Sequence, residues 1–294
     1  MKDYLILLAG TPRGGIQTWK SLIRYVKNPL DCDIALLYGD IFQMPEFLLK
    51  HTKFDWQFEE PKNWKDFYLE NYPNSNALDF LIKGEEYGTA GGIDKYSGSG
   101  AIVCGFKTIL FNNYLDYLSD YKYIIHSRFD QYYVDYHPKL IGEDIWIPKG
   151  EDYYGVCDRH AVFSSRYSEQ YFGISKFLSD KTAQENIKSK IIASESVFLE
   201  HLRYQGLENK IKRIDRLQFT SAASTDETRW RKAIYKIHFS KNLLMKYPDE
   251  FLSSIYNSLK NKKFKYFLKH PLLCINYFYL ILRRKAGNLL KDKT

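Results

Sequence analysis

The ten residues Tyr121-Lys-Tyr-Ile-Ile-His-Ser-Arg-Phe-Asp130 decide how the fold of this chain is interpreted. Their first part, Tyr121 to His126, is a short apolar run that predicts a buried β-strand. An arginine and a carboxylate, Arg128 and Asp130, follow directly after it. Charged residues at the carboxyl end of an inner strand lie where α/β sheets usually bind ligands. A surface ion pair would have the same pattern, and both interpretations stay open at this point.

The beginning of the chain predicts a βαβ unit. Tyr4-Leu-Ile-Leu-Leu8 is a continuous apolar run, as in strands that are buried on both faces. A Gly-rich turn, 9–15, leads into an amphipathic helix, and a second strand runs from Asp33 to Tyr38. Strands joined in this way pair in parallel with a right-handed crossover. The turn can hold a phosphate at the helix N-terminus, but it has neither the dinucleotide-binding nor the P-loop pattern.

The middle of the chain supplies further polar residues next to predicted elements. The turn Tyr96-Ser-Gly-Ser-Gly100 precedes a helix, and its glycines either let a ligand approach the backbone or form a plain loop. Ile145–Pro148 predicts a strand, and Asp158-Arg-His160 precedes another short apolar run, which suggests charged groups lining a cleft. Glu195 is expected in the first turn of a helix capped by Ser194, where an acid has a structural role.

Composition limits the class of protein. The chain has 294 residues, 45% of them hydrophobic, so we expect a globular protein with a substantial core. Its four cysteines are far apart and lack metal-ligand spacing, and no signal peptide is visible at the N-terminus. A reducing, cytoplasmic compartment is therefore expected.

The net charge of +8 comes from the C-terminal residues. Residues 260–294 hold ten Lys or Arg against one acid, whereas the preceding part is nearly neutral, unlike a nucleic-acid-binding domain. The apolar run from Pro271 to Leu282 is too short to span a bilayer, which takes about 20 residues. Two interpretations remain: an interfacial helix on an anionic membrane surface, or a helix packed on the core with a charged end.

Several motifs, in this order, resemble those of GT-A-like nucleotide-sugar-dependent glycosyltransferases of microbial, algal and viral polysaccharide synthesis. They cover about residues 1 to 235. The motifs are Gly10-Thr-Pro-Arg13, Thr18-Trp-Lys-Ser-Leu22, Ser97-Gly-Ser-Gly100, Arg128-Phe-Asp130, Gly155-Val-Cys-Asp158-Arg-His160 and Asp226-Glu-Thr-Arg-Trp230.

The resemblance implies a donor nucleotide between the first strand–helix turn and the end of the second strand. The residues it assigns to this donor site are Gly10, Thr11, Arg13, Tyr38, Asp40, Ser99, Gly100 and Lys107. Arg128 would bind the diphosphate, and Asp130 would hold Mg²⁺ or Mn²⁺. Because Arg128 replaces the first acid of the family's Asp-x-Asp, the metal dependence is an open question.

The same resemblance implies the catalytic groups. Asp158 would be the base of an inverting enzyme, assisted by Arg128 and His160. His160 and His238 are further candidate metal ligands, although a lone histidine is more often structural.

Together these observations predict an α/β fold. We expect a single GT-A-like, Rossmann-like domain over residues 1–240, with a mostly parallel central sheet flanked by helices, and a helical basic C-terminal extension over 241–294. The predicted function is transfer of a sugar from a nucleotide-diphosphate sugar to a glycan or lipid-linked acceptor in surface polysaccharide synthesis. The expected location is cytoplasmic and peripherally associated with a membrane. The alternative is a non-catalytic carbohydrate-binding or membrane-scaffold protein.

Overall fold

A computed structural model describes residues 2–96, 98–188, 191–224, 226, 235–236 and 242–291. The described chain divides into two compact units. The large unit comprises Met1–Pro12, Leu30–Phe129 and Pro138–Ile214, and the small unit comprises Arg13–Pro29, Asp130–His137 and Asp215–Thr294. Each unit is therefore built from three separate segments of the sequence.

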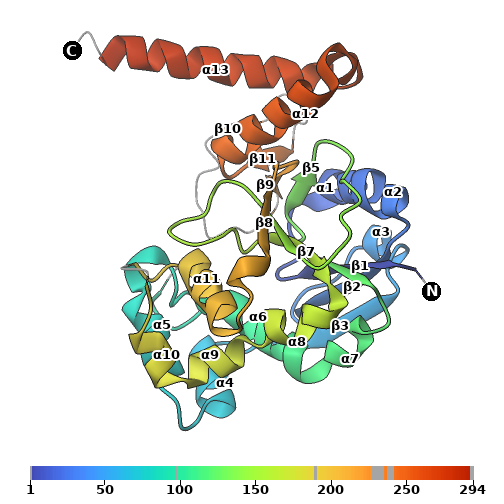
Figure 1. Ribbon diagram of the computed structural model, residues 1–294. Coiled ribbons are helices and arrows are strands. Elements are labelled where there is room, and N and C mark those ends of the chain that lie inside the picture. Colours follow the sequence, from blue (N-terminus) through green and yellow to red (C-terminus); the bar gives the residue numbers. More distant parts are fainter. Residues whose placement is uncertain are drawn as a thin grey trace. The chain divides into compact units, whose positions relative to one another are not determined.

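The described part of the large unit contains a seven-stranded sheet (Figure 1) in the order β3-β2-β1-β4-β7-β6-β8. Strand β7 is antiparallel to both of its neighbours, and the other neighbouring strands in this sheet are parallel. The prediction of an α/β fold with a mostly parallel central sheet is confirmed. The strands are β1 (Tyr4–Ala9), β2 (Asp33–Gly39), β3 (Phe54–Phe58), β4 (Tyr123–Ser127), β6 (Ile145–Pro148), β7 (His160–Ser164) and β8 (Ile211–Ile214).

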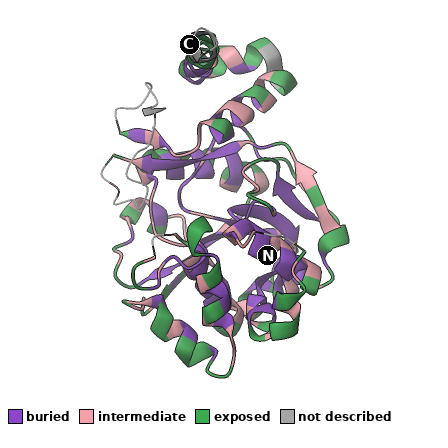
Figure 2. Cartoon of the chain, turned by 90° about the vertical axis from the view of Figure 1, so that its left-hand side faces the viewer, coloured by how far each residue is buried: buried purple, intermediate pink, exposed green. Residues whose placement is uncertain are grey.

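The inner strands are mostly apolar because both faces of the sheet are covered. All six residues of β1 are buried, and Figure 2 shows the central strands in the buried colour. The helices of this unit are α3 (Glu46–Leu49), α4 (Trp64–Asn71), α5 (Ala77–Lys83), α6 (Gly100–Asn113), α7 (Leu115–Leu118), α8 (Ser168–Phe172), α9 (Ile174–Ser179), α10 (Lys181–Glu185) and α11 (Ser194–Tyr204). Short 3₁₀ turns lie at Glu85–Tyr87, Ser165–Tyr167 and Glu208–Lys210, and α2 (Asn28–Leu30) precedes β2.

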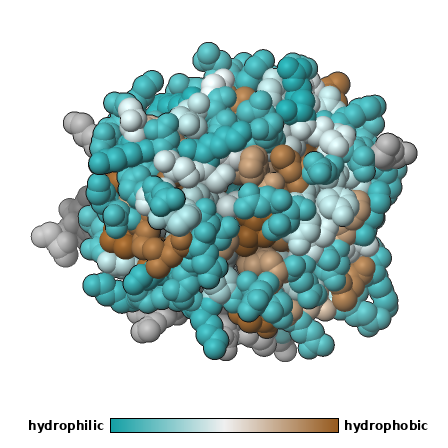
Figure 3. Space-filling view, turned by 90° about the horizontal axis from the view of Figure 1, so that it is seen from below, coloured by the Kyte–Doolittle hydropathy of each residue, from teal (hydrophilic) through white to brown (hydrophobic). Residues whose placement is uncertain are grey.

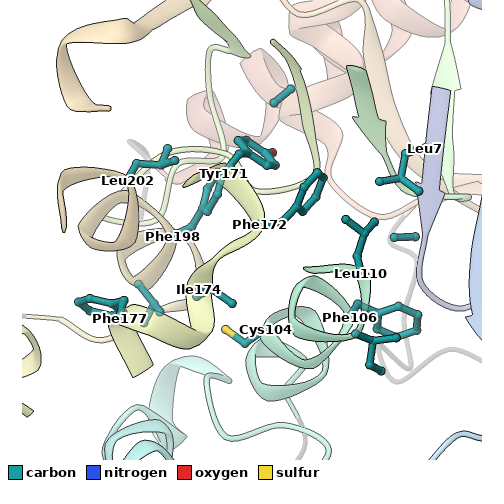
Figure 4. Close-up of a cluster of buried hydrophobic side chains, with 14 of the residues drawn as sticks. Leu7, Cys104, Phe106, Leu110, Tyr171, Phe172, Ile174, Phe177, Phe198 and Leu202 are labelled. Atoms are coloured by element: carbon teal, nitrogen blue, oxygen red, sulfur yellow. The ribbon is translucent and has the colours of Figure 1, made fainter. Parts of the chain in front are cut away.

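Helix α6 is packed on several sides by other elements. Gly105 lies against the indole of Trp64, and a Cβ atom there would come within 2.0 Å of that ring, so the packing requires glycine. Farther along, the large hydrophobic core joins α6 to α8, α9 and α11 through aromatic rings such as Tyr171, Phe177 and Phe198 (Figure 4). The face of the molecule seen in Figure 3 is mostly hydrophilic, with separate small apolar patches.

The described part of the small unit contains a four-stranded antiparallel sheet in the order β10-β11-β9-β5. Its strands are β5 (Gln131–Tyr133), β9 (Gln218–Ala223), β10 (Tyr235–Lys236) and β11 (Leu243–Met245). Helix α1 (Gly15–Leu22), which continues as a π-helical turn over Ile23–Lys27, packs against β5. Strands β1 and β2 pair in parallel as predicted, but the helix that joins them belongs to the small unit.

Helices α12 (Pro248–Lys269) and α13 (Pro271–Lys291) complete the small unit. The helical prediction for the C-terminal extension is confirmed over α12 and α13, whereas β11 lies within the predicted range 241–294. The boundary expected at residue 240 does not coincide with a boundary between the units. The reason is that β11 pairs with β9 and the Phe251 ring packs edge-on against Phe219, so the C-terminal segment is part of the small unit's core. Among the described residues, no helix is both long enough and apolar enough to cross a membrane.

Candidate functional site

One edge of the seven-stranded sheet collects several of the predicted site residues of the large unit. The register pairs Leu8 of β1 with Ser127 of β4, and Ser127 with His160 of β7. Because β7 runs in the opposite direction, its first residue lies beside the last residue of β4. The same edge of the sheet therefore carries Gly10 and Thr11, which follow β1, Arg128, which follows β4, and Asp158, which precedes β7. The structure thus brings together residues that are up to about 150 positions apart in the sequence, as expected for the ligand-binding edge of an α/β sheet.

Asp158 is a buried carboxylate with several polar neighbours. Its side chain is 6% exposed, and its Oδ2 accepts a hydrogen bond of 2.7 Å from the Ser194 hydroxyl. Burial by itself would raise the pKa of Asp158, but the positive charges of Arg159 and Lys107 together with the Ser194 hydrogen bond lower it below its ordinary value. Arg128 adds a smaller effect in the same direction. Asp158 is consequently a carboxylate that stays ionised at neutral pH inside the protein.

Arg159 connects Asp158 to a second acid, Glu195. The guanidinium Nη1 lies 2.7 Å from Glu195 Oε1 and 3.9 Å from Asp158 Oδ1, and Nη2 donates to the Glu151 carbonyl at 3.0 Å. Burial and the nearby charge of Asp158 raise the pKa of Glu195 to about 7. The two acids therefore differ: one is held ionised, and the other can exchange a proton near neutral pH.

Glu195 is a functional candidate that sequence reasoning missed. It does lie in the first turn of α11, as predicted, but its side chain is turned into the protein toward Arg159. Position at a helix N-terminus is a local property that the sequence reveals. The contact with Arg159 joins residues 36 positions apart in the sequence, and no local sequence pattern predicts it.

Lys107 is the most unusual group in this region. Lys107 is 3% exposed, and its ammonium nitrogen is buried without a hydrogen-bond partner among the described residues. The nitrogen lies 3.4 Å from the centroid of the Phe198 ring and 5.7 Å from that of Tyr171, the two rings labelled side by side in Figure 4. Burial lowers the pKa of Lys107 to about 8, and the charge of Asp158 opposes part of that effect.

Buried ammonium groups are rarely left without hydrogen bonds, because the desolvation cost is not recovered. Contact with aromatic faces offsets some of this cost. The remaining cost means that the buried charge of Lys107 destabilises the folded protein relative to a neutral side chain of the same size.

Two histidines flank the same region. His126 is buried in β4, and its Nδ1 lies 3.0 Å from the Tyr171 hydroxyl. Burial lowers the pKa of His126 to about 3, so the imidazole is neutral at physiological pH. His160 is buried at the start of β7 opposite Ser127. The Asp158-Arg159-His160 segment was expected to line a cleft. In this conformation all three residues are almost completely buried, so their side chains contact other parts of the protein and not solvent.

The predicted donor residues after β1 and β2 are placed at strand ends. Gly10 has a φ of +126°, which favours glycine, and its amide donates to the Leu37 carbonyl at 3.1 Å. The Tyr38 hydroxyl accepts a hydrogen bond of 2.5 Å from Gln57 Nε2, and its ring contacts Phe129 edge-on. Asp40 is exposed and accepts from the Glu60 amide at 3.0 Å. Thr11 is partly exposed.

The glycines before α6 approach the chain itself. The amides of Ser99 and Gly100 both donate to the Gly88 carbonyl at 2.9 Å. A Cβ atom on Gly100 would lie 2.5 Å from the Cα of Thr89. Close crossing by residues 88–91 therefore explains the glycine at position 100 without a ligand.

Arg13 and Asp130 belong to the small unit. The Asp130 carbonyl accepts hydrogen bonds from the Ser221 amide at 2.8 Å and the Ser221 hydroxyl at 3.2 Å. The Arg13 carbonyl accepts one from the Trp19 indole at 3.3 Å. Asp226 is described in the same unit. Residues 227–230 of its motif, Ser97 and His238 lie outside the described residues.

Asp226 occupies a position that the sequence pattern suggested for phosphate. Its Oδ2 accepts hydrogen bonds of 2.7 Å from the Gly14 amide, at the N-cap of α1, and from the Ala223 amide. A carboxylate at a helix N-terminus is favoured by the same dipole that would attract a phosphate. In this conformation the Gly14 amide is therefore bound by the protein's own acid.

A divalent cation was predicted at Asp130. Within the described ranges, no three His, Cys, Asp or Glu side chains are gathered so that they could hold a metal ion. Asp130 alone does not make a protein-built metal site, since Mg²⁺ is usually bound through one or two carboxylates together with substrate phosphates.

Neither protein-family models nor curated protein sequences gave a match to this chain. The assignment of a function therefore depends on the residues and geometry described above.

Proposed function

We propose that this protein is a nucleotide-sugar-dependent glycosyltransferase with a GT-A-like fold. It would transfer a sugar from a nucleotide-diphosphate sugar to a glycan or lipid-linked acceptor in surface polysaccharide synthesis. The observation that carries the proposal is the buried ionised Asp158, which is close to Arg159 and is stabilised by the charge of Lys107, at the sheet edge where α/β folds usually bind ligands. Perturbed acids and bases that gather in this way are typical of catalytic sites.

In the proposed reaction, an acceptor hydroxyl attacks the anomeric carbon of the donor sugar. The bond from that carbon to the diphosphate oxygen breaks, and the nucleoside diphosphate leaves with the electron pair. Asp158 accepts the hydroxyl proton, which requires the ionised carboxylate that its neighbours maintain. A single displacement of this kind inverts the configuration at the anomeric carbon.

The cations of the site have separate roles in this proposal. Arg128 is only partly buried, directly after β4, and its guanidinium can bind the departing diphosphate with two parallel hydrogen bonds. Lys107 is too deeply buried for the same use in this conformation, and we assign it to keeping Asp158 ionised. Mg²⁺ or Mn²⁺, bound through Asp130 and the donor phosphates, would neutralise further charge on the leaving group.

A panel of nucleotide sugars tests the proposal directly. The purified full chain is incubated with each donor, with and without a chelator, and release of nucleoside diphosphate is measured. At least one donor is expected to give release, and Asp158→Asn is expected to lower it by about a hundredfold or more while nucleoside-diphosphate binding is retained. The matched control is Asp120→Asn, at an exposed turn just before β4, which should leave release unchanged.

The second candidate is a non-catalytic carbohydrate-binding or scaffold protein. The replacement of the usual Asp-x-Asp by Arg128-Phe-Asp130 favours it. Absence of release with every donor, combined with retained binding of a glycan, would select this candidate over the transferase.

A further inference from the structure

Helix α13 has two apolar sides, and only one of them is used in the fold. Its inner side contributes to the core of the small unit, together with residues of α12 and the four-stranded sheet. The buried residues of this side are Leu273, Cys274, Tyr277 and Leu280. Arg284 Nη1 and Asp249 Oδ1, 2.6 Å apart, join α13 to the beginning of α12, so the two helices form a hairpin (Figure 1).

The outer side of α13 is a row of exposed apolar residues, which we call the outer stripe. Its members, with exposed fractions between 48% and 66%, are Leu272, Ile275, Phe278, Tyr279 and Leu282. At 3.6 residues per turn, these five positions fall within an arc of roughly 120°. A surface helix normally places polar residues on the side opposite the core, so a second apolar side calls for a partner.

The charges around the outer stripe identify the class of that partner. The 21 residues of α13 include several lysines and arginines and no acid. By helical geometry, Arg283 and Lys285 lie on opposite borders of the stripe, and both are exposed. An apolar stripe bordered by cations, with Phe278 and Tyr279 on the stripe itself, matches the boundary of an anionic bilayer. A second copy of this chain would instead bring the same cations face to face.

We propose that the outer stripe of α13 inserts into the interface of an anionic membrane and holds the protein at the membrane surface. The helix would lie in the plane of the interface with its inner side still packed on the small unit. No rearrangement of the core is needed, because every residue of the stripe is already exposed. This binding does not depend on the proposed transferase activity, although it would place such an enzyme beside lipid-linked acceptors.

Vesicle flotation of the full chain, without any donor, tests the proposal. Binding is expected to vesicles of phosphatidylcholine mixed with phosphatidylglycerol, and much less to phosphatidylcholine alone. Ile275→Glu combined with Leu282→Glu should lower the partition coefficient by about tenfold or more. Arg283→Gln and Lys285→Gln should each weaken binding to the anionic vesicles by about fivefold.

The matched control is Leu69→Glu, an exposed apolar position on α4 that should not change vesicle binding. Circular dichroism of each variant checks that the fold is kept. Unchanged binding of the Ile275→Glu, Leu282→Glu variant, or no binding of the full chain to anionic vesicles, would overturn the proposal. Sedimentation that shows a dimer converted to a monomer by the same double substitution, without vesicle binding, would overturn it in favour of self-association.

Discussion

Replacement of Lys107 by methionine should make the protein more stable while impairing its proposed reaction. Methionine has nearly the length of lysine and can fill the same space against Phe198 and Tyr171 without a charge. Burial lowers the pKa of Lys107 from 10.5 to about 8. Since each pH unit corresponds to about 1.4 kcal/mol, the charged form costs about 3 kcal/mol relative to the neutral amine.

The net gain at neutral pH is expected to be smaller than that cost. Lys107→Met also removes the contact of the ammonium with two rings and one of the positive charges beside Asp158. We therefore expect the free energy of unfolding to rise by about 1–2 kcal/mol near neutral pH. Donor turnover should fall at the same time, because loss of a neighbouring cation raises the pKa of Asp158 and with it the protonated fraction, which cannot accept a proton.

The pH dependence separates this explanation from a simple packing effect. Because the pKa of Lys107 is lower in the folded protein than in the unfolded chain, the wild type gains stability as pH rises from about 8 toward 10.5. The advantage of Lys107→Met should accordingly shrink between about pH 7 and about pH 10. Urea denaturation at the two pH values measures it.

Lys65→Met, on the exposed side of α4, is the matched control and should change stability by no more than about 0.5 kcal/mol. The reasoning would be refuted by a Lys107→Met variant that is less stable than the wild type at both pH values. A gain of the same size at both values would equally exclude the buried charge as its cause.

Three further substitutions test other parts of the structure. Glu195 has a folded pKa of about 7, above its ordinary 4.5, so the wild type should lose stability as pH rises from 4.5 to 7. Glu195→Gln should remove this dependence of stability on pH, which urea denaturation across the same pH window measures. Glu250→Gln should lower the free energy of unfolding in urea by about 3 kcal/mol or more, because Glu250 and Arg216 form a buried ion pair of 2.9 Å. The control Asp249→Asn removes an exposed ion pair at the neighbouring position and should cost less than about 1 kcal/mol, and equal effects would contradict the burial argument. Asp130→Asn should abolish nucleoside-diphosphate release from the donor without lowering the melting temperature, and full activity in that variant would remove Asp130 from the mechanism.

Much of the large unit's sheet could be predicted because the signals for it are local. The apolar runs Tyr4–Leu8, Asp33–Tyr38 and Ile145–Pro148 correspond to β1, β2 and β6, and the opening run near Tyr121 corresponds to β4. Burial on both faces requires continuous apolar strands, and this requirement is visible in any window of five or six residues. The gathering of Arg128 and Asp158 at one sheet edge was not predictable in this way, because it depends on the antiparallel direction of β7.

The interactions that give the site its chemistry are between residues far apart in the sequence, and no local pattern contains them. Arg159 meets Glu195 only because α11 begins beside β7, and Lys107 loses its contact with water only because Phe198 and Tyr171 close over it.

The boundaries of the two units show the same division between local and long-range information. The sequence by itself determined that helix α1 and the C-terminal helices would form, since their apolar periodicity is local. Only the tertiary structure decided that α1, residues 130–137 and the C-terminal helices belong to one unit, since that depends on the pairing of β5 with β9 and of β9 with β11. Long-range pairing is set by which surfaces can be buried together, and that is a property of the whole chain.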